Sequence, residues 1–582
     1  MNFSRLKYEG WLYGLAFLIA AGFRFIQLGA SPLTDSEASL ALQALGIARG
    51  ENPLLGPQPL YILFTSVLFA VIETTNFLAR FWPALAGSLL AFVPLFFREQ
   101  LKPRPALIFA FLIAIDPGLV ALSRQANGTI LAVAFLLFAW GMWNSRRLVP
   151  AGIFAGLALL SGTSLWAGVL SLVVTWLFVQ GLEARAASKE SEESESSTPE
   201  KEAVPANYQF RPALLALVLT IVLAGSLFFI APNGLSAWVS SLPAYLSGWM
   251  AASVMTPGRI LFTVLVYEPL GIFLAVLSLI RGYRTGSQRI IRLSIWLGVS
   301  LLLAVFYRQP GELAWAILPL LALAALELSR GLNIFPFERL EVGVVTTALL
   351  ILLTYIWFDI AAIGLDPFNQ FVTQIPIIGS VQNPRYAILY GALAILVACI
   401  AFVAFGWSPR IARLGSTWAF VIFLTFYGLG AAWGASGQRY PTGVELWTAD
   451  QKPVQADLLL ASVNDVSEFS VGEDASQPVT IVGINSPALE WLLHDREVQL
   501  VSALDSQLAP AIVITSMMSD LNLPSAYRGQ DFTWRQRVQY DIMPLPEWWR
   551  WLVNRQLPRE NETIILWARN DLFPDARTNQ QP

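Results

Sequence analysis

Two carboxylates, Asp35 and Glu37, follow the first long apolar segment of the chain and lie in the stretch from Ser31 to Leu60. On an extended loop, side chains two residues apart point to the same side. On a helix they diverge by about 200°, because each residue turns the chain by about 100°. A carboxylate that is partly desolvated at a membrane edge can hold a raised pKa and act as a general base toward a hydroxyl or an amine. General-base chemistry is therefore one interpretation of this pair.

The same residues also fit a structural role. Asp35 or Ser36 suits the N-cap of a helix that begins near Ala38. Glu37 would then lie in the first turn, where the positive end of the helix dipole favours a carboxylate. Spacing alone leaves capping and chemistry both open, so the choice depends on what the rest of the chain places beside the loop.

The composition identifies a polytopic membrane protein. Of 582 residues, 55% are hydrophobic and 13% are charged, whereas roughly a quarter of the residues are charged in soluble domains. The net charge of -3 offers no basic stripe for nucleic acid, which is not expected as a partner. The single histidine, His494, and the single cysteine, Cys399, exclude a His-cluster metal site and a disulfide framework, and no metal ligands are predicted.

The distribution of Lys and Arg predicts the topology. The apolar run from Leu60 to Ile72 is short of the ~20 residues that span a bilayer, so residues 58–78 are expected at the interface. With that assignment nearly every basic cluster falls on the cytoplasmic side, with the N-terminus inside and the C-terminus outside. The sequence thus predicts about 13 spans, the first retained rather than cleaved. They are 11–28, 82–97, 105–122, 129–143, two within 150–180, 212–231, 259–280, 293–306, 312–328, 340–361, 386–406 and 414–433.

Four regions follow from these patterns. Residues 1–180 form an N-terminal transmembrane module whose first outer loop, 30–79, carries the two carboxylates. Residues 181–211 are a Glu/Ser-rich linker, too poor in apolar residues to fold and expected to be disordered in the cytoplasm. Residues 212–435 form a second transmembrane region. Residues 436–582 alternate strand-like and helix-like runs, which predicts a small α/β domain on the outer face.

The motifs around the first outer loop resemble those of polytopic membrane glycosyltransferases with a GT-C fold. The similar group is the ArnT-like and protein-mannosyltransferase-like one (glycosyltransferase family 39-like), and the resemblance covers roughly residues 10–180. The matching positions are Arg24, Pro32–Ala38, Ala41–Leu45, Arg49–Gly50, Pro57–Tyr61, Ala79–Gly87 and Leu122–Asn127.

Three positions depart from the family pattern. Ser36 separates two acids that are usually adjacent, so which acid inherits the role of base is open. Gln58 stands where the family often has His, and Asn127 lies near a position where relatives often have Asp. These two changes put any family metal or donor contact there in doubt. No cofactor is firmly predicted, although a divalent metal is compatible with the resemblance.

The resemblance implies a donor sugar on a polyprenyl-phosphate carrier, and transfer with inversion. Asp35 is the first candidate for the base and Glu37 the second. Arg80 and Arg124 are expected to support the leaving phosphate, because a guanidinium offers paired donors to phosphate oxygens. The chain also lacks a P-loop or a GxGxxG element on a strand, so no nucleotide cradle is predicted. The alternative for the arginines is snorkelling to lipid headgroups.

Further residues are expected to line the cavity. Glu268 lies inside an apolar run, where an ionisable group is expensive and tends to be functional, unless it bonds a neighbouring helix near the Pro269 kink. The full set of possible cavity residues is Arg24, Gln58, Tyr61, Asn127, Glu268 and Arg308.

The sequence therefore predicts a polyprenyl-phosphate-dependent hexosyl- or pentosyltransferase, placed among membrane lipids and acting on the outer face of the cytoplasmic membrane. The acceptor, whether protein, glycan or lipid, is not identified. The alternative is a polytopic transporter or flippase of a lipid-linked substrate. Transporters often carry inverted repeats, and no convincing repeat is present across the linker.

Overall fold

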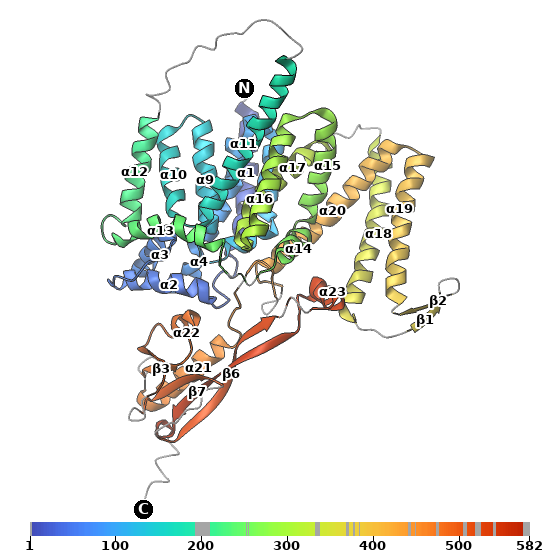
Figure 1. Ribbon diagram of the computed structural model, residues 1–582. Coiled ribbons are helices and arrows are strands. Elements are labelled where there is room, and N and C mark those ends of the chain that lie inside the picture. The colour runs from blue at the N-terminus through green and yellow to red at the C-terminus, as the bar shows by residue number, and fades with distance from the viewer. Residues whose placement is uncertain are drawn as a thin grey trace, which may run out of the picture.

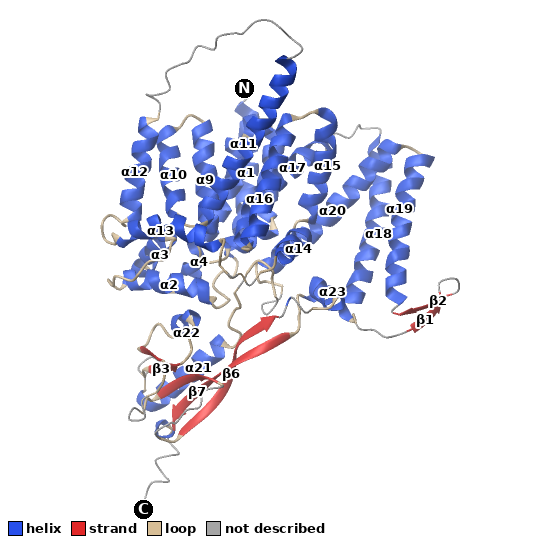
Figure 2. Cartoon of the chain, viewed as in Figure 1, coloured by secondary structure: helices blue, strands red, loops and turns tan. Residues whose placement is uncertain are grey.

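The protein is an α-helical bundle with a mixed β-sheet at one end, as the computed structural model shows (Figures 1 and 2). Length and apolar composition make it a multi-pass membrane protein. The structure describes residues 3–191, 210–251, 253, 255–331, 338–367, 372–375, 379–382, 384–439, 444–448, 450–472, 477–504, 509–517, 525–538, 540 and 543–573.

Helices account for nearly all of the first region. Most of their buried apolar residues belong to one large core, in which small residues such as Ala38, Ala41 and Ala44 allow close helix approach, and smaller apolar clusters lie beside it. The elements are α1 (Phe3–Phe25), α2 (Asp35–Ala48), α3 (Pro59–Val71), α4 (Asn76–Leu89), η1 (Leu90–Phe92), α5 (Val93–Phe96), α6 (Arg98–Leu101), α7 (Pro103–Ile115), α8 (Pro117–Ser123), α9 (Thr129–Asn144), α10 (Leu148–Leu160) and α11 (Ser164–Ser191).

The second region continues the bundle. Three of its helices, α18 to α20, pack around a second apolar core that is set apart from the first. The helices are α12 (Arg211–Gly225), α13 (Asn233–Gly248), α14 (Pro257–Tyr267), α15 (Pro269–Thr285), α16 (Gln288–Tyr307), α17 (Ala314–Gly331), α18 (Arg339–Leu365), α19 (Pro384–Gly406) and α20 (Pro409–Ala435). A hairpin of β1 (Val372–Ile375) and β2 (Gly379–Gln382) precedes α19.

Among the described residues, seven helices are long and apolar enough to cross a membrane, or nine if each of two bent pairs is one span. Four further apolar helices, α3, α9, α10 and α12, have 13, 16, 13 and 15 residues. Helices occupy all the expected spans, but length alone does not establish the expected total, which stays a prediction.

Helices α2, α3 and α13 lie across the end of the bundle that faces the C-terminal domain, whereas the N-terminus lies at the opposite end (Figure 1). The 13 residues of α3 are too few to span, and α3 packs on α2. The interfacial placement of residues 58–78 agrees with this arrangement. Which face is cytoplasmic stays a prediction.

Two expected spans are broken. Helix α7 meets α8 at a bend of 55°, and α14 meets α15 at a bend of 88°. Proline follows each break, at Pro117 and Pro269, and it removes a backbone donor while disfavouring helical geometry in the residue before it. The expected span at 259–280 is divided at the expected Pro269 kink into α14 and α15, which meet at a steep angle, and its crossing of the membrane as one span stays a prediction.

The C-terminal residues form the predicted small α/β domain. Its five strands have the order β4-β3-β5-β7-β6, with β3 parallel to β4 and β5, and β7 antiparallel to β5 and β6. The elements are α21 (Ala456–Val471), β3 (Val479–Val482), α22 (Pro487–Leu492), β4 (Val498–Val501), β5 (Ile512–Ser516), β6 (Tyr527–Val538), α23 (Leu545–Asn554) and β7 (Arg559–Arg569).

Helix α22 docks this domain onto the first outer loop. The indole N–H of Trp491 donates to Asn76 Oδ1 at 2.8 Å, and the Trp491 ring packs on Phe69 with centroids 5.6 Å apart. The guanidinium of Arg49 donates to the carbonyl oxygen of His494 at 2.7 Å. A second contact joins α23 to α18. The domain is thus held directly over the loop that carries Asp35.

The linker prediction is tested only at its edge. Helix α11 continues to Ser191, about ten residues beyond the expected linker start at 181. Residues 192–209 lie outside the described residues, so the disorder expected for 181–211 stays a prediction.

Candidate functional site

The first outer loop enters α2 through a capping box. Thr34 Oγ1 accepts from the Glu37 N–H at 3.4 Å, and Glu37 Oε2 accepts from the Thr34 N–H at 3.0 Å. The predicted cap is thereby corrected: Thr34 is the N-cap rather than Asp35 or Ser36, and the helix begins at Asp35. The Thr-x-x-Glu spacing is itself a sequence signal for this box.

Glu37 and Arg80 form a buried, bidentate ion pair. Arg80 Nε donates to Glu37 Oε1 at 2.9 Å and Nη2 donates to Oε2 at 2.8 Å. Their side chains are only 3% and 6% exposed for Arg80 and Glu37 respectively. The backbone N–H of Ala126 also donates to Oε1 at 2.9 Å, which ties the loop after α8 to the same carboxylate. Such a pair is stable only because hydrogen bonds satisfy its remaining polar atoms.

The other donors of Arg80 hold the loop before α2. Nη1 donates to the carbonyl oxygen of Ser31 at 2.8 Å and Nη2 to that of Pro32 at 3.0 Å. All three guanidinium nitrogens therefore already donate to protein acceptors. The predicted phosphate contact of Arg80 stays a prediction, and it would require some of these bonds to open.

The electrostatic environment makes Glu37 a weak base. Burial raises the pKa of its carboxyl group, but the charge of Arg80 and the hydrogen bonds from Arg80, Thr34 and Ala126 outweigh burial and lower the pKa to about 2. A carboxylate with so low a pKa gains little by accepting a proton near neutral pH.

Asp35 faces the C-terminal domain instead. Its Oδ1 accepts from Ser486 Oγ at 2.7 Å and from the Ala488 N–H at 3.1 Å, at the start of α22. Its Oδ2 pairs with the guanidinium of Arg535 from β6. The Asp35 side chain is 28% exposed, so it is far more accessible than Glu37. Asp35 thus joins the membrane bundle to the domain above it.

Arg24 and Arg124 satisfy the carbonyl groups that helix ends leave without partners. Arg124 donates to the carbonyls of Arg24 and Ile26, each at 2.9 Å, at the end of α1. Arg24 is buried and donates to the carbonyls of Ile113 at 3.2 Å and Ala114 at 3.1 Å, at the end of α7. Cations at helix C-termini also interact favourably with the dipole. Both side chains therefore position helices around the loop.

Three other expected cavity residues hold backbone segments together. Gln58 Oε1 accepts from the Gly128 N–H at 2.7 Å. Tyr61 is buried and donates to the carbonyl oxygen of Ala79 at 2.8 Å. Asn127 Oδ1 accepts from the Thr129 N–H at 3.0 Å. The contacts of Gln58 and Asn127 meet at the start of α9, beside the Glu37 pair.

Glu268 and Arg308 lie apart from this cluster. Glu268 is buried at the bend between α14 and α15, next to the Pro269 kink named as its alternative, and its carboxyl group faces Asp116 at the α7–α8 bend. Arg308 is an exposed residue that ends α16 in the left-handed conformation. The structure brings neither of them to Glu37.

Lys452 is a candidate that sequence reasoning missed. It is an exposed residue, yet enough protein surrounds its ammonium group that burial is the main cause lowering its pKa to about 8. Arg80 and Arg124 lower the pKa further, whereas Glu37 and Glu445 raise it. Within the described part of the chain, Lys452 has no hydrogen-bond or ion-pair partner.

No motif in the sequence marks Lys452, because the charged groups beside it other than Glu445 lie more than 300 residues away, in the N-terminal module. The cluster therefore combines an anchored carboxylate, Glu37, a partly exposed one, Asp35, and one ammonium group that is available to an anion. Across the described ranges, no group of three or more His, Cys, Asp or Glu side chains is arranged to hold a metal.

Comparisons with known proteins gave structural matches only. No family model matches the chain, and no curated protein matches it. The chain is similar to the crystal structure of ArnT from Cupriavidus metallidurans bound to undecaprenyl phosphate, at 14% identity and a TM-score of 0.49, covering 97% of this chain and 99% of that one. The apo form of that protein matches at 13% identity and the same TM-score of 0.49, covering 98% and 99%. An Archaeoglobus fulgidus oligosaccharyltransferase in complex with zinc and sulfate matches at 13% identity and a TM-score of 0.39, covering 87% and 68%.

The buried pair generates a stability prediction. Glu37→Gln removes the charge that neutralises Arg80, and leaving one partner of a buried pair costs about 3 kcal/mol of unfolding free energy. The double variant Glu37→Met/Arg80→Met should recover most of that loss, because no unpaired charge remains. Thermal unfolding in detergent, followed by tryptophan fluorescence, measures both.

The matched control is Glu51→Gln, an exposed acid of the same loop. If Glu37→Gln lowered the unfolding temperature no more than Glu51→Gln does, the pair would not stabilise the loop.

Proposed function

We propose that this protein is an inverting glycosyltransferase that takes a hexose or pentose from a polyprenyl-phosphate carrier. The acceptor lies on the membrane face that carries the C-terminal domain, which we assign to the outer face of the cytoplasmic membrane. The observation that carries the proposal is the position of the Lys452 ammonium group, which has no protein partner among the described residues and lies near Glu37, Arg80 and Arg124. The segment that carries Lys452 meets the start of α2 directly, because Asp450 accepts from the N–H of Ser36, the residue after the partly exposed Asp35. A lipid-linked phosphate reaches this level of a membrane protein. The sequence resemblance points to the same reaction.

Lys452 is the residue best placed to meet the donor phosphate. The leaving phosphate develops negative charge as the bond to the sugar breaks, and a preorganised cation stabilises it. Arg80 and Arg124 donate to protein carbonyls and shape the site around Lys452, although their charge still adds to the positive potential there. An anion bound at Lys452 would therefore displace no hydrogen bond, and the charges of Arg80 and Arg124 would offset those of the nearby Glu37 and Glu445.

Asp35 remains the first candidate for the base. Glu37 is nearly fully buried, its pKa is about 2, and its carboxylate accepts bonds from Arg80, Thr34 and Ala126. Asp35 is more exposed, and its ion pair is with a side chain of the neighbouring domain. A small displacement of Arg535 would release one carboxylate oxygen toward an acceptor.

The reaction then balances without a cofactor. The Asp35 carboxylate takes the proton of an acceptor hydroxyl or amine, whose lone pair attacks the anomeric carbon from the face opposite the phosphate. The bond between that carbon and the phosphate oxygen breaks, and its electron pair stays on the phosphate beside Lys452. Attack from the opposite face inverts the anomeric configuration.

One observation favours the transporter alternative. Broken helices that carry ionisable groups are typical of transporters, and both bent pairs bring a carboxyl group to the break, Asp116 and Glu268. A transporter would move a lipid-linked substrate between leaflets without forming a covalent product. Assays of proteoliposomes for both transfer and translocation separate the two functions.

The proposed role of Asp35 as a base can be separated from its contacts with Ser486 and Arg535, which hold the C-terminal domain. Asp35→Asn should lower sugar transfer by about 10²- to 10⁴-fold, the usual contribution of a general base. Arg535→Gln breaks the ion pair to the domain but leaves the carboxylate, so it should retain most of the activity. The measurement is release of free polyprenyl phosphate from a panel of polyprenyl-phosphate-linked hexoses and pentoses, with envelope extract as the acceptor.

Asp450→Asn is the matched control, because Asp450 Oδ2 accepts from the Ser36 N–H at 3.2 Å and an asparagine oxygen preserves that bond. Equal losses in Asp35→Asn and Arg535→Gln would show that Asp35 only anchors the domain.

Lys452 predicts a pH dependence of donor binding. Its pKa of about 8 means that the ammonium charge is lost as the pH rises through that value. The second ionisation of a phosphate monoester lies near pH 6, so the ligand charge is constant above neutrality. Binding of undecaprenyl phosphate, measured by thermophoresis, should weaken about tenfold between about pH 7 and pH 9.

Lys452→Arg should bind across that range without the fall, since arginine keeps its charge. Lys452→Met should bind undecaprenyl phosphate weakly at every pH. Lys102 is an exposed lysine in the loop before α7, so the control variant Lys102→Met should bind like the parent protein. If the affinity of the parent protein for undecaprenyl phosphate did not change between about pH 7 and pH 9, Lys452 would not be the phosphate contact.

A further inference from the structure

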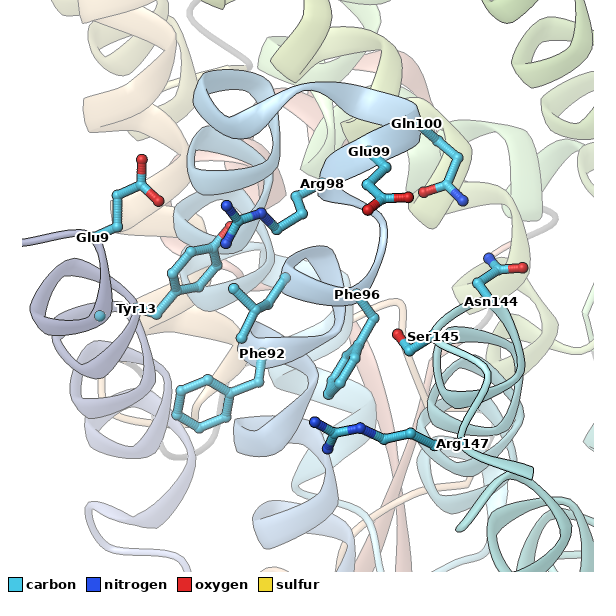
Figure 3. Close-up of a pocket in the computed structure, with 12 residues that line it drawn as sticks. Glu9, Tyr13, Phe92, Phe96, Arg98, Glu99, Gln100, Asn144, Ser145 and Arg147 are labelled. Carbon is cyan, nitrogen blue, oxygen red and sulfur yellow. The ribbon is translucent and has the colours of Figure 1, made fainter. Parts of the chain in front are cut away.

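A cavity lies at the end of the bundle opposite the C-terminal domain. Its volume is about 640 Å³, which is within the usual range of small-ligand sites. It is lined by α1, by the η1–α5–α6 segment and by the turn between α9 and α10 (Figure 3). None of the residues assigned to the candidate site lines it.

The polar part of this cavity carries two charges of each sign. Arg98, from α6, and Arg147, before α10, supply the cations, and Glu9 and Glu99 supply the carboxylates (Figure 3). Within the described residues, none of these four side chains has a hydrogen bond or salt bridge to another residue. Glu9 and Arg98 are half-buried and Glu99 and Arg147 are exposed, so a ligand that enters the cavity can reach all four charges without breaking a protein ion pair.

The rest of the lining combines the polar side chains of Gln100, Asn144 and Ser145 with an apolar, aromatic part. Phe92 and Phe96 contribute rings, and Tyr13 places a mostly buried ring beside Arg98. An apolar wall next to charged groups at the end of a membrane bundle matches an amphiphile whose headgroup reaches the charges while its chains stay in the bilayer. A small soluble anion would use the two arginines and leave the carboxylates and the apolar wall unused.

We propose that this cavity binds a zwitterionic aminophospholipid, which carries one phosphodiester and one primary ammonium group. The guanidinium groups of Arg98 and Arg147 bind the phosphodiester, because paired N–H donors match phosphate oxygens. Glu9 and Glu99 accept from the ammonium group. The four protein charges cancel, so the site complements a headgroup whose own charges also cancel. The lipid thereby joins α1 to the α9–α10 turn on the face opposite the proposed transfer site.

Lipid titration of the delipidated full-length protein tests this inference. The probe is dilauroyl phosphatidylethanolamine in detergent, with binding followed by native mass spectrometry. The parent protein should bind it more tightly than dilauroyl phosphatidylglycerol, which lacks the ammonium group. Arg98→Gln/Arg147→Gln should weaken binding by about tenfold or more, the scale of a lost charge-assisted hydrogen bond. Glu9→Gln/Glu99→Gln should abolish the preference between the two lipids.

Arg104→Gln is the matched control, since Arg104 is an exposed arginine that follows α6 and does not line the cavity. It should bind phosphatidylethanolamine like the parent protein, and unfolding temperatures without lipid should show that all variants fold. Unchanged binding in Arg98→Gln/Arg147→Gln, or an equal loss in Arg104→Gln, would overturn the site. Equal affinity for O-phosphoethanolamine, which has no acyl chains, would overturn the assignment to a lipid.

Discussion

The buried ion pair between Glu37 and Arg80 is the interaction on which the proposed site depends. Taking two charges out of water is costly, and only close geometry with further hydrogen bonds offsets that cost. Here the backbone N–H groups of Thr34 and Ala126 complete the carboxylate, and loop carbonyls complete the guanidinium. Because these partners belong to four separate segments, the pair fixes the loop before α2, the start of α2, helix α4 and the loop after α8 relative to one another.

The hydrogen bonds of each Lys and Arg side chain distinguish cations that hold the structure together from cations that are available to ligands. Arg24, Arg80 and Arg124 donate to carbonyls or to Glu37, so an anion would have to replace existing bonds. Lys452 and the arginines of the opposite cavity have no such partners within the described residues. An anion can therefore bind these cations without replacing a protein hydrogen bond. This reasoning favours Lys452 over the arginines as the phosphate contact.

Much of the architecture could be predicted because helices in a membrane require long runs of apolar residues, which are visible in the sequence. Apolar runs marked the helices, the shortness of the run from Leu60 to Ile72 marked a helix too short to span, and alternating runs marked the C-terminal α/β domain. The Thr34 cap was also readable, from Thr-x-x-Glu. The partners of Asp35 were not, because Ser486 and Arg535 lie more than 440 residues along the chain and no local pattern encodes that contact. Lys452 was missed for the same reason, and the bend at Glu268 exceeds what a proline alone indicates.

The two groups assigned to the chemistry come from different parts of the molecule. Asp35 belongs to the bundle, whereas Lys452 and Arg535 belong to the region that carries the C-terminal domain. In the proposed reaction, the position of that domain determines both whether a cation is present at the donor phosphate and whether Arg535 is paired with the Asp35 carboxylate. In the docked arrangement the cation is in place and Asp35 is paired, so proton removal requires a local shift of Arg535 rather than separation of the domain. A substrate that binds between bundle and domain would supply the contacts that favour this shift, which couples acceptor binding to release of the base.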